Sequence, residues 1–140
     1  MPRIELLDWG SARAEASRIR TTVFVEEQSV PVEIEMDDKD AASVHAIAYV
    51  DGRAVGTGRL LPDGHIGRMA VLKESRGGGV GGAILERLVD EARRRGMKEV
   101  ALSAQTHALG FYRKHGFREA GPVFEEAGIP HQEMRRVLNS

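Results

Sequence analysis

The chain has 140 residues, of which 41% are hydrophobic and 29% charged; this fits one globular domain over residues 1–140 and excludes extensive disorder. It has no cysteine, which excludes a disulfide framework, thiolate zinc sites and a cysteine nucleophile. The formal net charge of −1 gives no reason to expect nucleic acid or an anionic membrane as a partner.

The sequence contains nothing typical of a membrane or secreted protein. No apolar run approaches the roughly 18 residues that a membrane-spanning helix needs. The first residues, Met1 to Glu5, include an acidic side chain and are not followed by an apolar stretch, which is unlike a signal peptide. Together with the absence of cysteine, this predicts a cytoplasmic protein.

The N-terminal part of the chain predicts one helix and an acidic segment. Ser11 is expected to cap a helix that runs to Arg20, and Pro31 to end the regular structure that follows. From residue 33 to residue 40 the chain is predominantly acidic. A solvated loop is one interpretation of this segment, and a mouth that attracts a cationic amine is the other.

Three antiparallel strands are predicted next. The runs 44–50 and 54–61 favour strands, and Asp51-Gly52 between them is typical of a tight hairpin turn. After a second turn, residues 65–72 are expected to form the third strand. Glycines within strands often mark a bulge or the close approach of another segment, and the strands contain three of them: Gly56, Gly58 and Gly67.

The clearest helical pattern begins near Gly79. Apolar residues recur at helical spacing from Val80 to Ala92, with charged residues on the other face, and Gly96 is expected to end the helix. The remaining pattern predicts a strand over residues 100–104, a helix over 108–115, and two last strands at 117–119 and 131–138. This order of elements indicates an α+β domain.

The most informative stretch is the turn between the third strand and the long helix, Arg76-Gly77-Gly78-Gly79-Val80-Gly81-Gly82. The first turn of a helix has N–H groups without partners and a partial positive charge, and both attract phosphate oxygens. Glycines let a phosphate approach these donors and allow the positive φ angles that turn successive N–H groups inward. Because each glycine within a helix costs about 1 kcal/mol relative to alanine, so many of them favour a diphosphate site over a merely flexible turn.

Two other phosphate-binding motifs fit this turn less well. A P-loop requires Gly-Lys-Ser/Thr after the glycines, where this chain has Gly81-Gly82-Ala83. A dinucleotide fingerprint is formally present in Gly77, Gly79 and Gly82. It also requires an acidic residue at the far end of the next strand, whereas Glu99 precedes that strand and antiparallel hairpins precede the motif.

The pattern Arg76-x-x-Gly79-x-Gly81 after Met69-Ala70-Val71 resembles the coenzyme A signature of the GCN5-related N-acetyltransferases (GNAT family). A second stretch, Leu102–Gln105 through Phe111–Phe117, is similar to that family's second signature, in which a tyrosine precedes a Gly-Phe turn. The runs Val23–Gln28, Val55–Leu60 and Ile66–Val71 resemble its ElaA/YjcF-like branch. The resemblance covers nearly the whole chain and implies a single mixed, mostly antiparallel sheet of six to seven strands flanked by about four helices.

The resemblance also implies how acetyl-CoA, as co-substrate, would be bound. Backbone groups of Met69, Ala70 and Val71 would hold the pantetheine arm like an added strand, and an N–H of Ala70 or Val71 would polarise the thioester carbonyl. The side chain of Arg76 would hold the diphosphate together with the backbone N–H groups of the glycine turn, namely Gly77, Gly78, Gly79, Val80, Gly81 and Gly82. Gln105 stands where many relatives have an asparagine that contacts the coenzyme.

Tyr112 matches the position of the family's general acid, and a phenol with a pKa near 10 is protonated at neutral pH. The general base is left open by the sequence, with water and several side chains as candidates: Glu27, Asp40, His45, His65 and His107. Each of these side chains also has a structural interpretation. No cluster has the spacing of metal ligands, so no metal is expected.

The implied activity is transfer of an acetyl group to a primary amine, on a small molecule or a peptide, by direct attack in a ternary complex. An acyl-homoserine-lactone-synthase-like acyltransferase is one alternative, because Arg20-x-x-Val23-Phe24 and the acidic segment are similar to that group. A catalytically inactive acyl-CoA-binding module is the other. The family often dimerises, so the resemblance is compatible with a homodimer.

Overall fold

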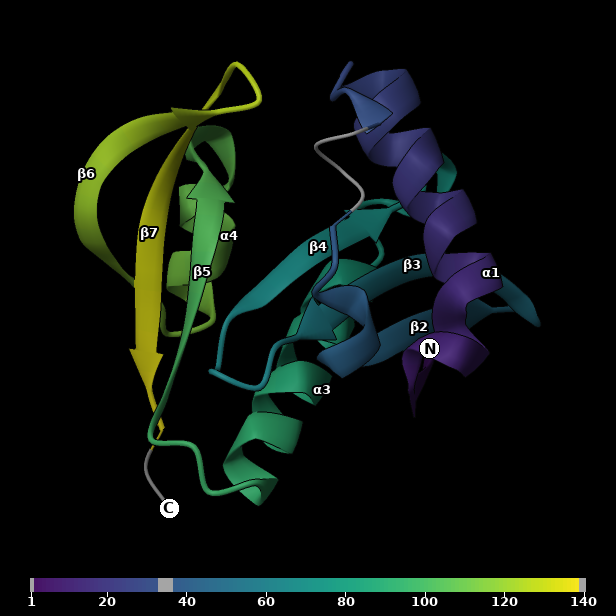
Figure 1. Cartoon of the computed structure of the whole chain (residues 1–140), viewed down its shortest axis with the longest axis horizontal. Helices are drawn as coiled ribbons and strands as arrows, with labels where there is room; N and C mark the ends of the chain where they lie inside the picture. The colour runs from purple at the N-terminus through teal and green to yellow at the C-terminus, as the bar shows by residue number, and fades with distance from the viewer. Residues whose placement is uncertain (1, 33–36, 139–140) are drawn as a thin grey trace.

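The computed structural model describes residues 2–32 and 37–138, which fold into two antiparallel sheets and the helices that cover them (Figure 1). The first sheet has the order β1-β2-β3-β4, and the second has the order β5-β7-β6. The strands of the first sheet are β1 (Arg3–Leu7), β2 (Val44–Val50), β3 (Arg53–Leu60) and β4 (Ile66–Val71). Those of the second are β5 (Glu99–Gln105), β6 (Arg118–Glu126) and β7 (Ile129–Val137). The expected α+β fold class is therefore confirmed.

Three α-helices lie in the described part of the chain: α1 (Trp9–Arg20), α3 (Val80–Arg94) and α4 (Leu109–Lys114). Figure 1 shows α1 and α3 on opposite faces of the first sheet, with α4 beside the second sheet. After α1 the chain continues as a π-helix over Thr21–Glu27, here called the π segment. The apolar faces of α1 and α3 and the inner sides of the strands form the core, and Leu88, Val89 and Phe117 in it are fully buried.

The seven strands do not form the single continuous sheet that was expected. The two sheets meet at one isolated parallel bridge, between His65 and Ala101. From there β4 and β5 diverge toward their carboxyl ends, as Figure 1 shows. A bulge bends β4, because Thr57 and Arg59 of β3 pair with Ala70 and Gly67, which leaves one extra residue in β4.

Two strand glycines allow α3 to lie close against β3. A Cβ at Gly56 would come within 2.8 Å of Ile84, and one at Gly58 would come within 2.9 Å of the same side chain. Real Cβ atoms do not tolerate such contacts, so these glycines set the distance between helix and sheet. The expectation of a close approach is confirmed for this pair, and α3 is thereby positioned with its N-terminus beside the end of β4.

Other local expectations differ from the structure at element ends. The helix α1 begins at Trp9 and is capped by Asp8, whose carboxylate accepts a hydrogen bond from the Ser11 N–H at 2.9 Å, so Ser11 is not the cap. The strand β1 was not anticipated, because its stability comes from antiparallel pairing with β2 rather than from its own pattern. The Asp51-Gly52 turn has positive φ at both residues, 53° and 78°, as the hairpin prediction requires.

Candidate active site

The glycine-rich turn follows β4 and opens α3, as predicted. Gly79 is the N-cap of α3 with φ at 86°, and Gly77 has φ at 84°; both values lie in the region that favours glycine. A Cβ at Gly77, Gly78 or Gly79 would meet no atom within 4 Å. The backbone here is therefore bare and open on its outer side, with the unpaired N–H groups of the α3 first turn next to it.

Gly81 and Gly82 have a different environment from the first three glycines. A Cβ at Gly82 would come within 3.1 Å of His115 Nε2, and one at Gly81 within 3.7 Å of Phe111. Both contacts come from α4 and the residue that caps it. The absence of a side chain at Gly82 thus allows α4 to pack against the first turn of α3, which explains part of the glycine content without a ligand.

The side chain of Arg76 is held by two groups. Its Nε donates to the Val71 carbonyl at 2.9 Å, and its Nη2 lies 2.9 Å from both carboxylate oxygens of Glu27. Glu27 is the last residue of the π segment. The guanidinium is thereby placed over the end of β4, beside the glycine turn, where a diphosphate at the α3 N-terminus could reach it.

Of the three β4 residues expected to hold the pantetheine arm, Met69 lies within the bulge, and Ala70 and Val71 directly follow it. Arg68 has φ at 50°, which is unusual for a residue other than glycine and bends the strand. Ala70 and Val71 pair with β3 through one edge of β4. Beyond the His65–Ala101 bridge, the opposite edge of β4 has no strand partner among the described residues, which is the condition for an extended ligand to pair with it.

Tyr112 is half-buried on α4. Its ring packs edge-on against Phe111 and Phe117, at centroid distances of 5.0 and 6.0 Å. Burial raises the pKa of Tyr112 to about 12, so the hydroxyl stays protonated throughout the neutral range. Gln105, at the end of β5, donates through Nε2 to Gln28 Oε1 at 2.9 Å, which links β5 to the residue that follows the π segment.

The candidate general bases differ in whether their side chains already form hydrogen bonds or ion pairs with other residues. His45 is buried, its Nε2 lies 2.9 Å from the Asp40 carbonyl oxygen, and its ring contacts Trp9, so it has a structural role. The Asp40 carboxylate accepts from two arginines, and that of Glu27 accepts from Arg76. His65 lies at the opposite end of β4 and pairs with Asp63. The remaining side chain, His107, is exposed just after Gln105.

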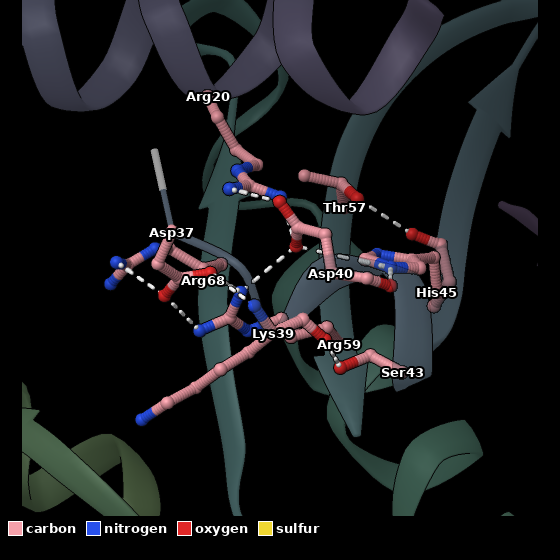
Figure 2. Close-up of polar contacts among 10 residues, drawn as sticks. Arg20, Asp37, Lys39, Asp40, Ser43, His45, Thr57, Arg59 and Arg68 are labelled. Atoms are coloured by element: carbon pink, nitrogen blue, oxygen red, sulfur yellow. Dashed lines mark hydrogen bonds and ion pairs between the residues drawn. The ribbon is translucent and has the colours of Figure 1, made fainter. Parts of the chain in front are cut away.

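Asp37 and Asp40, in the described part of the acidic segment, belong to a largely buried ion-pair network that was not predicted from the sequence. Asp40 accepts from Arg20 and Arg59, each at 2.9 Å, and Asp37 accepts from Arg59 at 2.8 Å and from Arg68 at 3.2 Å. Figure 2 shows these side chains converging between α1 and the first sheet. An arginine inside an apolar strand, as Arg59 is, requires buried partners, and this was the available signal. Glu33 and Glu35 of the acidic segment lie outside the described residues.

The network connects the acidic segment to the bulge of β4, because Asp37 contacts the bulged residue Arg68 as well as Arg59. Asp37 therefore acts on the strand that precedes the glycine turn. The solvated-loop interpretation is wrong for Asp37 and Asp40, of which Asp40 is only 5% exposed. Both carboxylates have arginine partners, which also weakens the case for an open anionic mouth at these two residues.

Acid should weaken this network. Hydrogen bonds from Arg59 hold the pKa of Asp37 well below its usual value. A carboxyl with a depressed folded pKa stabilises the fold above its unfolded pKa, about 3.9, and loses that contribution as pH falls further. We expect Asp37→Asn to cost about 2 kcal/mol of unfolding free energy at pH 7 and to make stability less dependent on pH between about 5 and 2. Urea unfolding across this range checks it, with Asp38→Asn at an exposed neighbour as control; parallel curves for wild type and Asp37→Asn would contradict it.

Residues 2–32 and 37–138 contain neither a candidate membrane-spanning helix nor a candidate metal-binding cluster. None of the helices there is long and apolar enough to cross a membrane. In the same residues, no group of three or more histidine and acidic side chains is arranged to hold a metal ion.

Comparison with known proteins supports the resemblance seen in the sequence. The family model described as "Acetyltransferase (GNAT) domain" matches residues 12–138. YjcF of Bacillus subtilis, described as an uncharacterised N-acetyltransferase, is 41% identical over 126 residues, which cover 87% of this chain and 90% of YjcF. The crystal structure of ElaA from Escherichia coli is similar with a TM-score of 0.87 and 28% identity, over 96% of this chain and 99% of ElaA.

A further structural neighbour is BjaI, a CoA-dependent acyl-homoserine lactone synthase whose structure contains SAM and isopentyl-CoA. It has a TM-score of 0.81 and 16% identity, over 99% of this chain and 84% of BjaI; at this identity the likeness shows the fold alone. The family model spans nearly the whole chain, and the relatives with high identity match over most of their own length. The chain therefore belongs to the GNAT family of acetyltransferases, in the branch that includes YjcF and ElaA.

Proposed function

We propose that this protein transfers the acetyl group of acetyl-CoA to a primary amine by direct attack in a ternary complex. The observation that carries the proposal is the bare turn Gly77–Gly79, with positive φ at Gly77 and Gly79, which opens α3 beside the bulged strand β4. In a member of an acetyltransferase family, this is the place where the coenzyme diphosphate fits.

The coenzyme would run from the α3 N-terminus along the unpaired edge of β4. The N–H groups of the glycine turn and the guanidinium of Arg76 would hold the diphosphate. The pantetheine arm would add to the edge of β4 at Met69, Ala70 and Val71, as a peptide adds to a sheet edge. An N–H of Ala70 or Val71 would then donate to the oxyanion that forms when the amine attacks the thioester carbonyl.

The reaction requires the amine to lose one proton and the sulfur to gain one. We assign to Tyr112 a hydrogen bond from its hydroxyl to the departing sulfur. Complete transfer from a phenol with a pKa of about 12 to a thiolate with a pKa near 8.5 is uphill. The hydroxyl therefore stabilises the developing thiolate by a hydrogen bond and keeps its own proton, and the proton that the amine releases passes through water or His107 to the sulfur.

A thiol-release assay with acetyl-CoA tests the proposed function. The purified chain is incubated with acetyl-CoA and a panel of amines, amino acids, polyamines and peptides, and free coenzyme A is measured together with the acetylated product by mass spectrometry. We expect thiol release that depends on the amine. Binding of coenzyme A without release in any mixture would instead favour a non-catalytic acyl-CoA-binding module.

The acyl-homoserine-lactone-synthase-like alternative is tested in the same format. S-adenosylmethionine replaces the amine panel, and acyl-CoA donors of increasing chain length replace acetyl-CoA. We expect no lactone product with these substrates. A lactone product would replace the proposed acetyl transfer by this alternative.

A further inference from the structure

Glu27, the last residue of the π segment, and Gln28, the residue after it, hold both side chains that were expected to contact the coenzyme. Glu27 binds the guanidinium of Arg76, and Gln28 accepts from the amide of Gln105. Arg76 follows β4 and Gln105 ends β5, so the two contacts join the diverging strands at their carboxyl ends. Neither role of Glu27 or Gln28 was anticipated from the sequence.

The carboxylate of Glu27 occupies Nη2 of Arg76, which is one of the donors that a phosphate group would use. Nη2 reaches both carboxylate oxygens at 2.9 Å, while Nε is committed to the Val71 carbonyl. Carboxylate and phosphate are recognised by guanidinium in the same geometry. A diphosphate at the α3 N-terminus would also approach the negative charge of Glu27, which opposes its binding.

Glu26 and Glu27 lie on the exposed side of this end of the π segment, while Phe24 packs against the core and Val30 is buried. The π-helix is a rare form that occurs frequently at functional sites, and Val23 is the one buried residue of this segment. Besides the hydrogen bonds within the π-helix itself, the Gln28 N–H donates to the Val23 carbonyl at 3.2 Å and the Val30 N–H donates to the Phe24 carbonyl at 2.8 Å. The side chains of Glu27 and Arg76 are 30% and 42% exposed, so their ion pair can exchange partners at small cost.

We propose that Glu27 competes with the coenzyme diphosphate for Arg76, so that coenzyme binding displaces its carboxylate and releases the end of the π segment. This inference rests on the proposed function, because it takes the glycine turn as the coenzyme site. Since the π segment directly follows α1, whose last residue Arg20 belongs to the buried network, coenzyme binding would be coupled to the region around the acidic segment.

Coenzyme A binding measured by calorimetry tests the competition. Glu27→Gln keeps the size of the side chain and removes its charge, and it should bind coenzyme A about three- to fivefold more tightly than wild type. Glu26→Gln is the matched control, because it removes the same charge from the exposed adjacent residue, and its affinity should stay within about twofold of wild type. Pantetheine, which lacks the phosphates, should bind all three proteins equally.

A second measurement follows the release of the segment. Amide hydrogen exchange at residues 24–30 should become faster in wild type when coenzyme A is added, and it should already be faster in Glu27→Gln without it. If Glu27→Gln is unfolded according to thermal melts, Glu27→Asp is used in its place. Aspartate has the same charge on a side chain that is one methylene shorter, so its carboxylate reaches Arg76 less well. This variant should also bind coenzyme A more tightly than wild type.

The outcomes separate this inference from the function on which it rests. If wild type binds coenzyme A and Glu27→Gln binds it equally or more weakly, Glu27 holds Arg76 in its binding position and the competition is refuted. An equal gain in coenzyme A affinity for Glu26→Gln would show that the gain comes from the change in overall charge, and this would also refute the competition between Glu27 and the diphosphate. If wild type does not bind coenzyme A, the proposed function fails together with the inference.

Discussion

Tyr112→Phe is expected to lower kcat for acetyl transfer about 100-fold, the low end of the range for removing a hydrogen-bond donor to charge that develops in the transition state. The substitution removes the hydroxyl and keeps the ring, whose edge-on contacts with Phe111 and Phe117 preserve the packing of α4. Affinity for coenzyme A should stay within about twofold of wild type, because the hydroxyl acts on the sulfur only as the bond breaks. Steady-state thiol release and calorimetry on the same samples give both quantities.

The chain offers a matched control for this substitution in its other tyrosine. Tyr49 lies on β2, which β3 separates from β4, and the guanidinium of Arg3 stacks over its ring at 4.5 Å. Tyr49→Phe should leave kcat within about twofold of wild type, since it removes a hydroxyl that touches no reacting atom. Equal rates for wild type and Tyr112→Phe would remove Tyr112 from the mechanism.

Gly79→Ala is expected to weaken coenzyme A binding about tenfold or more. Gly79 is the N-cap of α3 with φ at 86°, which an alanine adopts only with strain of about 1–2 kcal/mol. If the backbone relaxes, the N–H groups of the turn leave the positions that face the diphosphate. The loss of one hydrogen bond to a charged group corresponds to about tenfold in affinity.

Gly96 provides the control that separates this effect from stability. It lies just after the other end of α3 with φ at 79°, and a Cβ there would also meet no atom within 4 Å. Gly96→Ala should therefore lower the unfolding free energy by about as much as Gly79→Ala, about 1–2 kcal/mol, while coenzyme A binds as to wild type. Similar affinity of both variants for coenzyme A would show that the diphosphate does not lie on the Gly79 turn.

Asp37 and Glu27 have a feature in common. Each binds an arginine that is distant from it in sequence and that lies in β4 or shortly after it. Asp37 binds Arg68 at the bulge, and Glu27 binds Arg76 at the start of the glycine turn. The first pair is largely buried and the second half-exposed. Asp37 is therefore suited to fix the shape of the strand, whereas Glu27 is suited to exchange its partner.

Local sequence was sufficient to predict those elements that a short pattern of residues stabilises by itself. The apolar spacing from Val80 to Ala92 predicted α3, because a helix with one apolar face must bury that face. The Asp51-Gly52 pair predicted a tight hairpin turn, because both positions require positive φ. The glycine turn at the start of α3 was also predictable, since so many glycines at a helix start lower the intrinsic stability of the helix and so stand out from the surrounding sequence.

Which strands pair with each other, and which charged side chains form ion pairs, was decided only by the tertiary structure. The division of the seven strands into two sheets depends on the bulge at Arg68 and on a single bridge between His65 and Ala101, which no local propensity encodes. The burial of Asp37 and Asp40 depends on arginines contributed by α1, β3 and β4. The contact of Glu27 with Arg76 joins residues 49 positions apart. A sequence read along the chain predicts what each segment can form, but charges and strand edges acquire partners only when the segments pack together.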